Sequence, residues 1–519
     1  MFTISSSLLL LTISTIPKLV IAAPHNGRDV QSPYSHSSQT IELKAVKHDA
    51  RAPLHHTTNI RARSSQYTSS NNETSVLAGH APYFAAPVTI GSQTFNLVVD
   101  TGSSDTWVAD SFFTCMKYGT PVSQAYCELD LTFVNDGDGN WVTPATNWSF
   151  FLSYADGSYV GGPMGLAQIN LTSDISLSQF TGFASALSWD GGNLTSGMLG
   201  LGYSAGTSMY HSTDFWDHIP CSIETPGMGI DSQGNSVQCT QQTYSGVAET
   251  LMSSNTLNGN NQFSLALSRD SSNTSTGGLL TFGGTPDYHL PTVNLSSSFV
   301  ESPIKPLAYD PTNTTRYYSI SIDGFSFPAF TNYSSTTTTT SYTPSFTDDA
   351  SGSSSSSSHK LKLTHTRRTT TSKTYTLSES DGTTQFIVDS GTEVTTIPRL
   401  YAETFNSLFN PPAERYSGVY YLNCTTLSYI PPFGITIAGQ TFYHNPEDLV
   451  LRRPSTTWDY ELQEYVDSEV CLSAIADADQ VGGGYTLNIL GQPTLKNVLA
   501  VFDVGNSKMG FAARPYYES

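Results

Sequence analysis

Two short segments of this 519-residue chain are near copies of each other. Residues 95–104 read FNLVVDTGSS, and residues 385–392 read QFIVDSGT. In each segment a β-branched, apolar run leads without polar alternation into an acid, a hydroxyl residue and a glycine, which predicts a buried strand that ends in a tight turn. One such motif is weak evidence, because Asp-Ser/Thr-Gly is common in ordinary turns. The pair predicts that Asp100 and Asp389 leave two equivalent strands.

A second pair of matching segments follows at similar spacing. Residues 198–202 (MLGLG) lie downstream of Asp100, and residues 489–491 (ILG) lie downstream of Asp389. The chain is therefore expected to contain two copies of one lobe. Over residues 83–513 it resembles the pepsin-like aspartic endopeptidases, in which each lobe provides one catalytic Asp and an apolar-apolar-Gly segment braces the active-site turn.

This resemblance implies an all-β, bilobal pepsin-like aspartic protease fold, with two pseudo-twofold-related β lobes and the active site between them. Composition agrees, because charged residues make up only 13% of the chain, whereas residues typical of strands and turns are abundant. A chain of 519 residues is also too long for one ordinary core and suits two lobes.

The chain divides into segments of different composition. An apolar, hydroxyl-rich stretch followed by small residues predicts a signal peptide over residues 1–22. Residues 23–75 are polar and basic without a core-forming pattern, and the resemblance implies an inhibitory propeptide there, with Lys44, Lys47 and His48 as candidates to cover the active-site acids. An N-terminal β lobe is expected over 76–272 and a C-terminal β lobe over 273–519. Residues 331–380 interrupt the latter as a Ser/Thr-rich insert that we expect to be disordered.

Two carboxylates held close together share one proton, because like charges in a partly dry cleft raise one pKa and lower the other. Asp100 and Asp389 are the candidates for such a catalytic pair. The ionised acid would take a proton from a water, and the protonated acid would donate to the scissile carbonyl. By resemblance, four neighbours would support the pair through backbone N–H groups and hydroxyls: Gly102, Ser103, Gly391 and Thr392.

Residues 153–158 resemble the tip of the flap hairpin that closes over substrate in this family, and their Gly-containing turn supports a hairpin independently. Tyr154 would be the flap tyrosine, with Trp107 as its hydrogen-bond partner. The other candidate substrate-binding residues are Asp156, Gly157, Ser158 and Glu393.

The chain departs from the commoner family pattern at three positions near the second motif. Ser390 replaces a more usual Thr, and Gln492 stands where an acid is common. Glu393 occupies a position where a small hydroxyl residue is typical, so we expect an extra negative charge near the amino-terminal side of a substrate. It could favour basic residues there or raise the apparent pKa of the catalytic pair.

Six cysteines in an exported chain favour disulfides, for which the sequence allows fifteen pairings. Pairing of neighbours gives Cys115–Cys127, Cys221–Cys239 and Cys424–Cys471, and the first and last of these resemble loops that the family also links. Glycosylation sequons agree with a secretory route. They occur at Asn72, Asn147, Asn170, Asn193, Asn273, Asn294, Asn313, Asn332 and Asn423.

The formal charge of −20 argues against nucleic acid or anionic membranes as partners and suits an acidic medium. No His-Glu-x-x-His motif occurs, which argues against a zinc hydrolase. Neither a metal nor another cofactor is expected. The resulting prediction is a secreted, extracellular, monomeric aspartic endopeptidase without a membrane anchor, which cleaves polypeptides at acidic pH and is inhibited by its own propeptide and by pepstatin-type compounds. An acidic vacuole is the alternative location.

Two other functions remain open. A pepsin-like protein can serve only in binding, although such proteins have usually lost a catalytic Asp and both are present here. Residues 202–206 (GYSAG) match the nucleophile-elbow pattern of serine hydrolases, with Ser204 as nucleophile and His289 or His444 as base. That fold requires alternating helices and strands, which the flanking composition does not predict.

Overall fold

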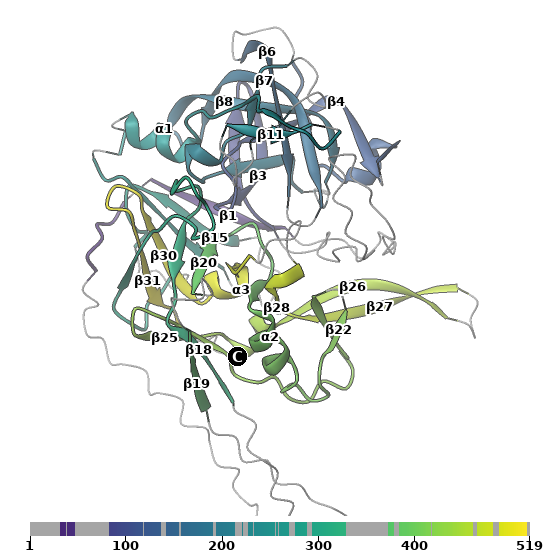
Figure 1. Ribbon diagram of the computed structural model, residues 1–519, viewed down its shortest axis with the longest axis vertical. Helices are drawn as coiled ribbons and strands as arrows, with labels where there is room; N and C mark the ends of the chain where they lie inside the picture. Colours follow the sequence, from purple (N-terminus) through teal and green to yellow (C-terminus); the bar gives the residue numbers. More distant parts are fainter. Residues whose placement is uncertain are drawn as a thin grey trace, which may run out of the picture.

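The computed structural model describes residues 32–37, 39–46, 83–328, 372–377 and 384–515, with gaps at 118, 136–141, 155–156, 190–191, 193, 213–218, 220, 222–226, 232, 255, 258, 269–275, 288–292, 417, 460–463 and 481–486. Strands dominate, and they form two lobes that lie one above the other in Figure 1. The expected all-β, bilobal fold is confirmed. No helix in the described ranges combines the length and apolar character of a membrane span.

The upper lobe in Figure 1 is built from most of one sixteen-stranded sheet. Its strands in this lobe run in the order β13-β10-β6-β7-β8-β4-β9-β3-β2, with β5 paired to β4. Their bounds are β2 Tyr83–Ile90, β3 Gln93–Asp100, β4 Trp107–Lys117, β5 Thr120–Val122, β6 Val142–Ser153, β7 Tyr159–Asn170, β8 Ser176–Ser188, β9 Gly197–Gly200, β10 Met209–Tyr210 and β13 Gln241–Gln242. A separate ribbon and three short helices complete the lobe: β11 Met228–Ile230, β12 Ser236–Gln238, η1 Gln124–Cys127, η2 Ser204–Gly206 and α1 Val247–Ser253.

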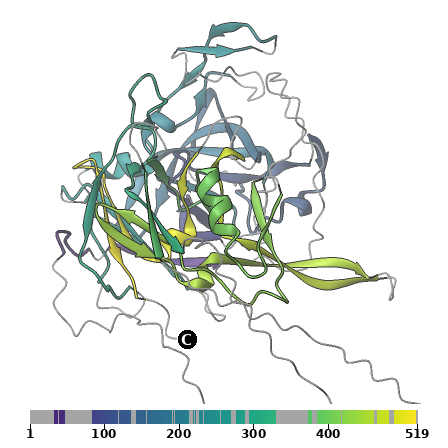
Figure 2. The same cartoon turned by 60° about the horizontal axis from the view of Figure 1, so that its bottom comes forward.

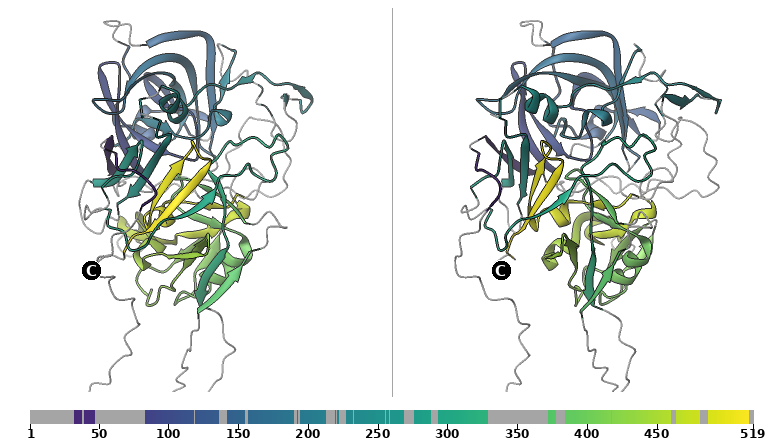
Figure 3. Two further views of the ribbon diagram at one scale, coloured as in Figure 1. Left: turned by 90° about the vertical axis from the view of Figure 1, so that its left-hand side faces the viewer. Right: turned by 60° about the vertical axis from the view of Figure 1, so that its left-hand side comes forward.

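The same sheet continues from β2 through β1-β15-β14-β30-β31-β16 and so joins the two lobes. Figure 3 shows this part beside the lobe boundary, with the yellow pair β30 and β31 near the chain's end. Its strands are β1 Thr40–Val46, β14 Gln262–Leu267, β15 Thr276–Phe282, β16 Val300–Pro303, β30 Val498–Asp503 and β31 Lys508–Ala513. All six residues of β14 and of β30 are buried, as expected for strands covered on both faces.

Strand β1 comes from the segment in which we expected a propeptide without a core-forming pattern. It pairs with β15 on one side and β2 on the other. Its alternating residues Ile41 and Leu43 are buried in the main core, and the Tyr34 hydroxyl donates to Glu301 of β16 at 3.0 Å. The prediction that this segment has no core-forming pattern was therefore wrong for residues 40–46. Ile-Glu-Leu-Lys at 41–44 alternates apolar and polar residues, as a half-buried strand does.

The lower lobe contains three smaller sheets, with strand orders β17-β20-β29-β21-β28, β19-β18-β24-β25 and β22-β23-β27-β26. Figure 2 shows these sheets with the lower end of the molecule turned forward, and the β26–β27 hairpin projecting from it. The first sheet comprises β17 Ser319–Ser321, β20 Gln385–Val388, β21 Thr395–Ile397, β28 Ile475–Asp477 and β29 Ile489–Leu490. The others comprise β18 Gly324–Pro328, β19 Ser372–Thr376, β24 Gly434–Ile437, β25 Gln440–Tyr443, β22 Glu414–Tyr416, β23 Val419–Leu422, β26 Val450–Asp459 and β27 Glu464–Ser473. The helices are α2 Arg399–Asn406, α3 Gln492–Leu495, η4 Pro446–Leu449 and η5 Ala478–Gln480.

The insert of the second lobe is shorter than the expected 331–380. Residues 372–376 form strand β19, which is antiparallel to β18 with Pro328 opposite Ser372. Tyr375 of β19 stacks on Phe327 with ring centroids 4.3 Å apart. This packing accounts for the ordered end of a segment whose composition predicted disorder. The rest of the insert, and the expected lobe boundary at 272, lie outside the described residues.

Candidate active site

Each catalytic candidate leaves a strand that is paired in parallel with its own bracing strand. β3 pairs with β9, which places Asp100 opposite Gly200, and the Leu201 N–H donates to the Asp100 carbonyl at 2.8 Å. β20 pairs with β29 in the same way, and the Asp389 N–H donates to the Leu490 carbonyl at 3.1 Å. An acid-bearing segment and its apolar-apolar-Gly segment therefore form one local structure. This structure is present once in each lobe.

Glycine is required at the end of each bracing strand. A Cβ on Gly200 would lie 2.6 Å from the carbonyl oxygen of Asp105, and one on Gly491 would overlap the carbonyl oxygen of Val394. Neither position has room for a side chain, because the backbone of the active-site turn packs directly against it. The glycines thus set how closely each turn approaches its brace.

The carboxyl group of Asp100 is fixed by two donors from its own turn. Oδ1 accepts from the Gly102 N–H at 2.7 Å, and Oδ2 accepts from the Ser103 hydroxyl at 2.5 Å. Asp100 is only 5% exposed, so these bonds replace much of the hydration that the group loses.

Asp389 has the same arrangement. Its Oδ1 accepts from the Gly391 N–H at 2.7 Å, and its Oδ2 accepts from the Thr392 hydroxyl at 2.5 Å. The structure therefore brings both sequence-predicted acids and their four predicted supporting residues into one matched constellation.

The two carboxyl groups lie against each other across the lobe boundary. A Cβ on Gly102 would lie 2.5 Å from Oδ2 of Asp389, and one on Gly391 would lie 2.6 Å from Oδ1 of Asp100. Burial, and next the charge of Asp389, raise the pKa of Asp100 well above the usual carboxyl range. Asp100 therefore keeps its proton at a pH at which an isolated carboxylic acid would be ionised.

Thr101 and Ser390 link the two turns. The Thr101 hydroxyl donates to the Val388 carbonyl at 2.9 Å, and the Ser390 hydroxyl donates to the Val99 carbonyl at 2.7 Å. Sequence reasoning noted Ser390 only as a departure and missed Thr101. The signal was available, because a hydroxyl residue follows the acid in both copies of the motif.

Gln492, another of the three departures from the family pattern, also contacts the second turn. Its side-chain Nε2 donates to the Ser390 carbonyl at 3.1 Å, and its backbone N–H donates to the Thr392 carbonyl at 2.9 Å. An amide at this position thus supplies a donor that an ionised acid could not supply.

The predicted flap is the hairpin of β6 and β7. Tyr154 N–H donates to the Ser158 carbonyl at 2.8 Å, and Gly157 has a positive φ of 85°, which a side chain would strain. Trp107, fully buried, donates from Nε1 to the Tyr154 hydroxyl at 2.8 Å. The expected partner residues are therefore in contact, whereas Asp156 lies outside the described residues.

Glu393 does not present an isolated negative charge. Its carboxylate forms an ion pair with the guanidinium of Arg453 on β26, and both side chains are mostly buried. The sequence suggested the charge of Glu393 but gave no sign of this partner, which is sixty residues away in the chain.

Asp105 is a second buried acid close to the first turn. It is 1% exposed and accepts from the Ser208 N–H at 3.0 Å and from the Tyr244 hydroxyl at 2.7 Å. Burial raises its pKa to about 6, although these two donors act in the opposite direction. Sequence reasoning did not identify this group as unusual.

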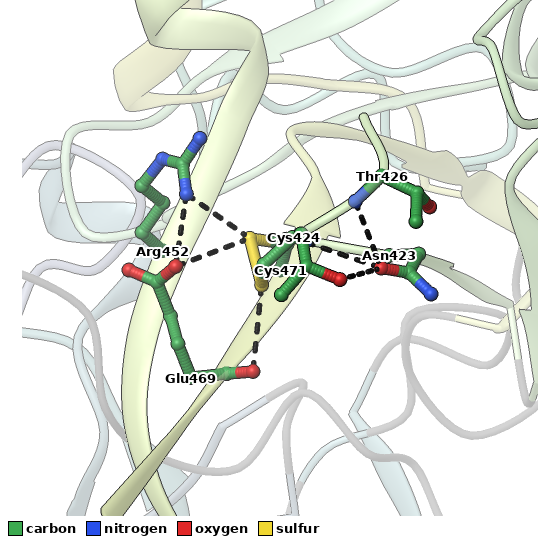
Figure 4. Close-up of a disulfide and its surroundings, with 7 residues drawn as sticks. Asn423, Cys424, Thr426, Arg452, Glu469 and Cys471 are labelled. Atoms are coloured by element: carbon green, nitrogen blue, oxygen red, sulfur yellow. Dashed lines mark hydrogen bonds and ion pairs between the residues drawn. A yellow bond between two sulfur atoms is a disulfide. The ribbon is translucent and has the colours of Figure 1, made fainter. Parts of the chain in front are cut away.

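All three expected disulfides are confirmed: Cys115–Cys127, Cys221–Cys239 and Cys424–Cys471. Figure 4 shows the third, with the ion pair of Arg452 and Glu469 beside it. Cys424, Glu469 and Cys471 have their ligand atoms within 4.8 Å of one another, but both thiols are consumed in the disulfide and are not available to a metal.

The remaining predicted residues fall in different places. Ser204 and His444 are not brought together, because Ser204 belongs to η2 of the first lobe and the His444 ring bonds the Thr494 hydroxyl of the second at 3.0 Å. Among the sequons, Asn170 is partly exposed, and the exposed ones are Asn147, Asn294, Asn313 and Asn423. Lys44 lies on β1. Predictions outside the described residues are Lys47, His48, Asn72, Asn193, Asn273, His289 and Asn332.

The chain is similar in sequence to known aspartic proteases. A probable aspartic-type endopeptidase of Aspergillus fumigatus is 28% identical over 446 residues, which cover 83% of this chain and 78% of that protein. Secreted aspartic protease 1 of Candida albicans is 28% identical over 158 residues, which cover 28% of this chain and only 35% of that protein. The crystal structure of an aspartic proteinase from Irpex lacteus aligns with a TM-score of 0.49 and 19% identity, over 84% of this chain and 96% of that one.

The sequence model of the eukaryotic aspartyl protease family matches residues 83–342 and 336–514, which together include both acid-bearing turns. This match spans most of the chain and both lobes. The chain therefore belongs to the eukaryotic aspartyl protease family.

Proposed function

We propose that this protein is a secreted endopeptidase that hydrolyses peptide bonds of polypeptides at acidic pH, with Asp100 and Asp389 as its catalytic pair. The observation that carries the proposal is the matched pair of carboxyl groups. Each has its inner oxygen held by a glycine N–H and its outer oxygen held by a hydroxyl. A protein retained only for binding has no need for both halves of this arrangement.

In the proposed reaction the ionised carboxylate takes a proton from a water between the two acids, and this water attacks the scissile carbonyl carbon. The protonated carboxyl donates its proton to the carbonyl oxygen, so charge does not build up on the tetrahedral intermediate. Collapse of that intermediate returns a proton to the leaving amine and regenerates the shared proton. Tyr154 of the flap, held by Trp107, closes over the substrate.

Residues 1–22 are proposed to act as a signal peptide and residues 23–75 as an inhibitory propeptide. The expected location is extracellular, with an acidic vacuole as alternative. The protein is proposed to act as a monomer, without cofactor or membrane anchor, and to bind pepstatin-type inhibitors. Secretion of the named Candida albicans relative supports this location. The second candidate function is a pepsin-like binding protein that does not cleave its ligand.

The test is cleavage of denatured globin by the acid-treated protein from about pH 2 to about pH 8, with and without pepstatin. Asp100→Asn and Asp389→Asn variants, shown to be folded by circular dichroism, serve as controls. Cleavage at acidic pH that pepstatin and each substitution abolish supports the proposal. Unchanged cleavage by folded Asp389→Asn overturns the mechanism. A folded, processed protein that binds peptides without cleaving them favours the binding function.

A further inference from the structure

The leader segment, defined as residues 32–37 and 39–46, is built into the sheet that joins the two lobes. Strand β1 lies between β2 and β15 in that sheet, and Figure 1 shows it at the lobe boundary beside β15. The sheet therefore passes from the first lobe to the joining strands through β1. Without β1, residues 83–85 of β2 and 276–281 of β15 would lose their backbone partners on one edge.

The apolar side chains of the leader segment are part of the protein's core. Leu43 is fully buried and Ile41 nearly so, and both belong to the main core cluster. Tyr34 is also buried, its ring lies edge-on to Phe299 with the centroids 5.0 Å apart, and its hydroxyl donates to Glu301 at 3.0 Å. Burial at both ends of the segment favours a bound strand over a solvated one.

Two glycines outside the leader segment leave room for it. A Cβ on Gly510 of β31 would lie 2.3 Å from the hydroxyl oxygen of Tyr34 and 2.6 and 2.7 Å from its ring. A Cβ on Gly284 would lie 2.2 Å from the Ser35 carbonyl oxygen and 3.2 Å from the Cβ of Ser37. Neither glycine has a positive φ, so its backbone conformation would allow a side chain. The leader segment is what excludes one at both positions.

Backbone hydrogen bonds fix the part of the leader segment that precedes β1. The Ser37 N–H donates to the Thr285 carbonyl at 3.0 Å, and the Thr285 N–H donates to the Ser35 carbonyl at 2.9 Å. The Thr172 hydroxyl, in the loop between β7 and β8, donates to the Gln39 side chain at 3.1 Å. Backbone bonds and apolar contacts do not depend on the ionisation of a side chain, so acid alone does not remove them.

We propose that the leader segment is a permanent strand of the mature protein. A cut anywhere between residues 47 and 82 leaves it bound without a covalent link, so the processed protein consists of two chains. The site between β2 and β15 takes an extended segment with an aromatic anchor, Tyr34, followed by the alternating apolar residues Ile41 and Leu43.

Processing then requires cleavage after residue 46 and not departure of the whole expected propeptide 23–75. This inference goes beyond the proposed function, because it concerns a strand-binding site that does not include the catalytic pair. Retention of the strand does not require that the protein cleaves any substrate.

The experiment cuts the chain and asks whether the fragment stays. A thrombin site with Gly-Ser linkers is inserted after Arg63 in an Asp100→Asn background, which prevents self-cleavage, and the same protein without the site is the control for cutting elsewhere. The cut protein is passed over a size-exclusion column at neutral pH and at about pH 3.5, where exposed carboxyl groups are largely protonated. We expect denaturing mass spectrometry to find both chains in one peak, in equal amounts, at both pH values.

Variants show which contacts retain the fragment. The cut protein is mixed with an excess of synthetic peptide that spans residues 32–46, and loss of the original fragment is followed over time. Leu43→Ala should speed this loss by at least about thirtyfold, because truncation of a buried leucine is costly. Gly510→Ala should also speed it, but should add little to Tyr34→Ala, because the missing ring leaves room for the methyl group. Glu42→Ala, at an exposed position of β1, is the matched control and should leave the rate unchanged.

A large chain that stays folded by circular dichroism after its fragment has eluted separately overturns the inference. Equal loss of the fragment from Leu43→Ala and Glu42→Ala also overturns it. The cut parent carries no substitution in the leader segment, so it tests retention even if a variant fails to fold.

The protein with both catalytic acids links this result to activity. After acid treatment, a preparation that cleaves globin should still contain a fragment that includes residues 32–46, and an active preparation without this fragment overturns the inference. A retained fragment without globin cleavage defeats the proposed function and supports the inference.

Discussion

Thr101 and Ser390 hold each other across the lobe boundary. Each backbone N–H donates to the hydroxyl of the other residue, at 3.1 Å from Thr101 and 3.0 Å from Ser390. Each hydroxyl in turn donates to a carbonyl in the strand that delivers the opposite acid. The positions of Asp100 and Asp389 relative to each other are therefore set by four reciprocal hydrogen bonds between buried residues.

Thr101→Val should remove the hydrogen bonds of the Thr101 hydroxyl without leaving a cavity, because valine is close in size to threonine. The substitution leaves the Val388 carbonyl and the Ser390 N–H without their partner, which costs about 1–3 kcal/mol for each buried group. We expect a lower midpoint of urea unfolding and a reduced kcat with little change in KM. Ser390→Thr, which retains the hydroxyl, is the matched control. Full activity of Thr101→Val would show that the link does not position the acids.

Asp105 should make the protein less stable as the pH rises. Its pKa is raised from the usual 3.8 to about 6, so the folded state binds the proton more tightly than the unfolded state does. Between these two values unfolding releases a proton, and stability falls with rising pH until it levels off above about pH 6. A shift of this size corresponds to a loss on the order of 3 kcal/mol.

Asp105→Asn should remove this fall, as measured by urea unfolding in steps between about pH 3.5 and about pH 6.5. Asp310→Asn provides a control of opposite sign. Although burial raises the pKa of Asp310, hydrogen bonds from Thr312 and Arg316 lower it on balance. Asp310 therefore adds stability above its unfolded pKa, and its removal should cost stability mainly at the upper end of the range. A pH slope that is unchanged in Asp105→Asn would assign the effect to another group.

The sequence predicted the residues that lie within each repeated motif better than those that meet through packing. Asp100, Gly102 and Ser103 are neighbours in the chain, so a local turn already places the donors beside the acid. Tyr244 reaches Asp105 from 139 residues away, and Arg453 reaches Glu393 from a different sheet. Such contacts depend on how strands pack, and a single sequence without alignment carries no local signal for them.

The leader strand shows a different kind of limit. The prediction for residues 40–46 followed their polar surroundings, although a short alternation of apolar and polar residues was present in the sequence. The strand is ordered because β2 and β15 supply hydrogen-bonding partners on both of its edges. A propensity argument for an isolated segment could not include those partners.

Leu43→Ala should therefore destabilise the unprocessed protein. Leu43 is fully buried in the main core, and such truncations cost about 2–5 kcal/mol. The measurement is urea unfolding in an Asp100→Asn background, which prevents self-cleavage of the leader. Glu42→Ala, at an exposed position of the same strand, should change stability by less than about 0.5 kcal/mol. Equal effects of the two substitutions would mean that β1 is not part of the folded unit.

The insert should be removable without loss of folding or activity. Pro328 and Ser372 are opposite each other in the pairing of β18 with β19, so the two positions to be joined after removal of residues 329–371 are already adjacent. Replacing them with Asn-Gly provides a two-residue turn that suits antiparallel strands. We expect unchanged globin cleavage and a melting temperature within about 2 °C of the parent. A longer deletion through residue 376 also removes Tyr375 from its stack on Phe327, and should lower the melting temperature.

The hydrogen bond between Trp107 and Tyr154 should control the flap. Trp107→Phe keeps most of the buried ring but removes the indole N–H, and Tyr154→Phe removes the acceptor. If the bond holds the flap over the substrate, each substitution should lower kcat/KM, and the double variant should be hardly worse than either alone. A coupling of about 1 kcal/mol is expected for a bond of this kind. The double-mutant cycle is measured as kcat/KM on one peptide substrate at the pH optimum. The unfolding midpoints of the same variants are measured in parallel. Additive losses would show that the two residues act independently, and that Trp107 serves the core alone.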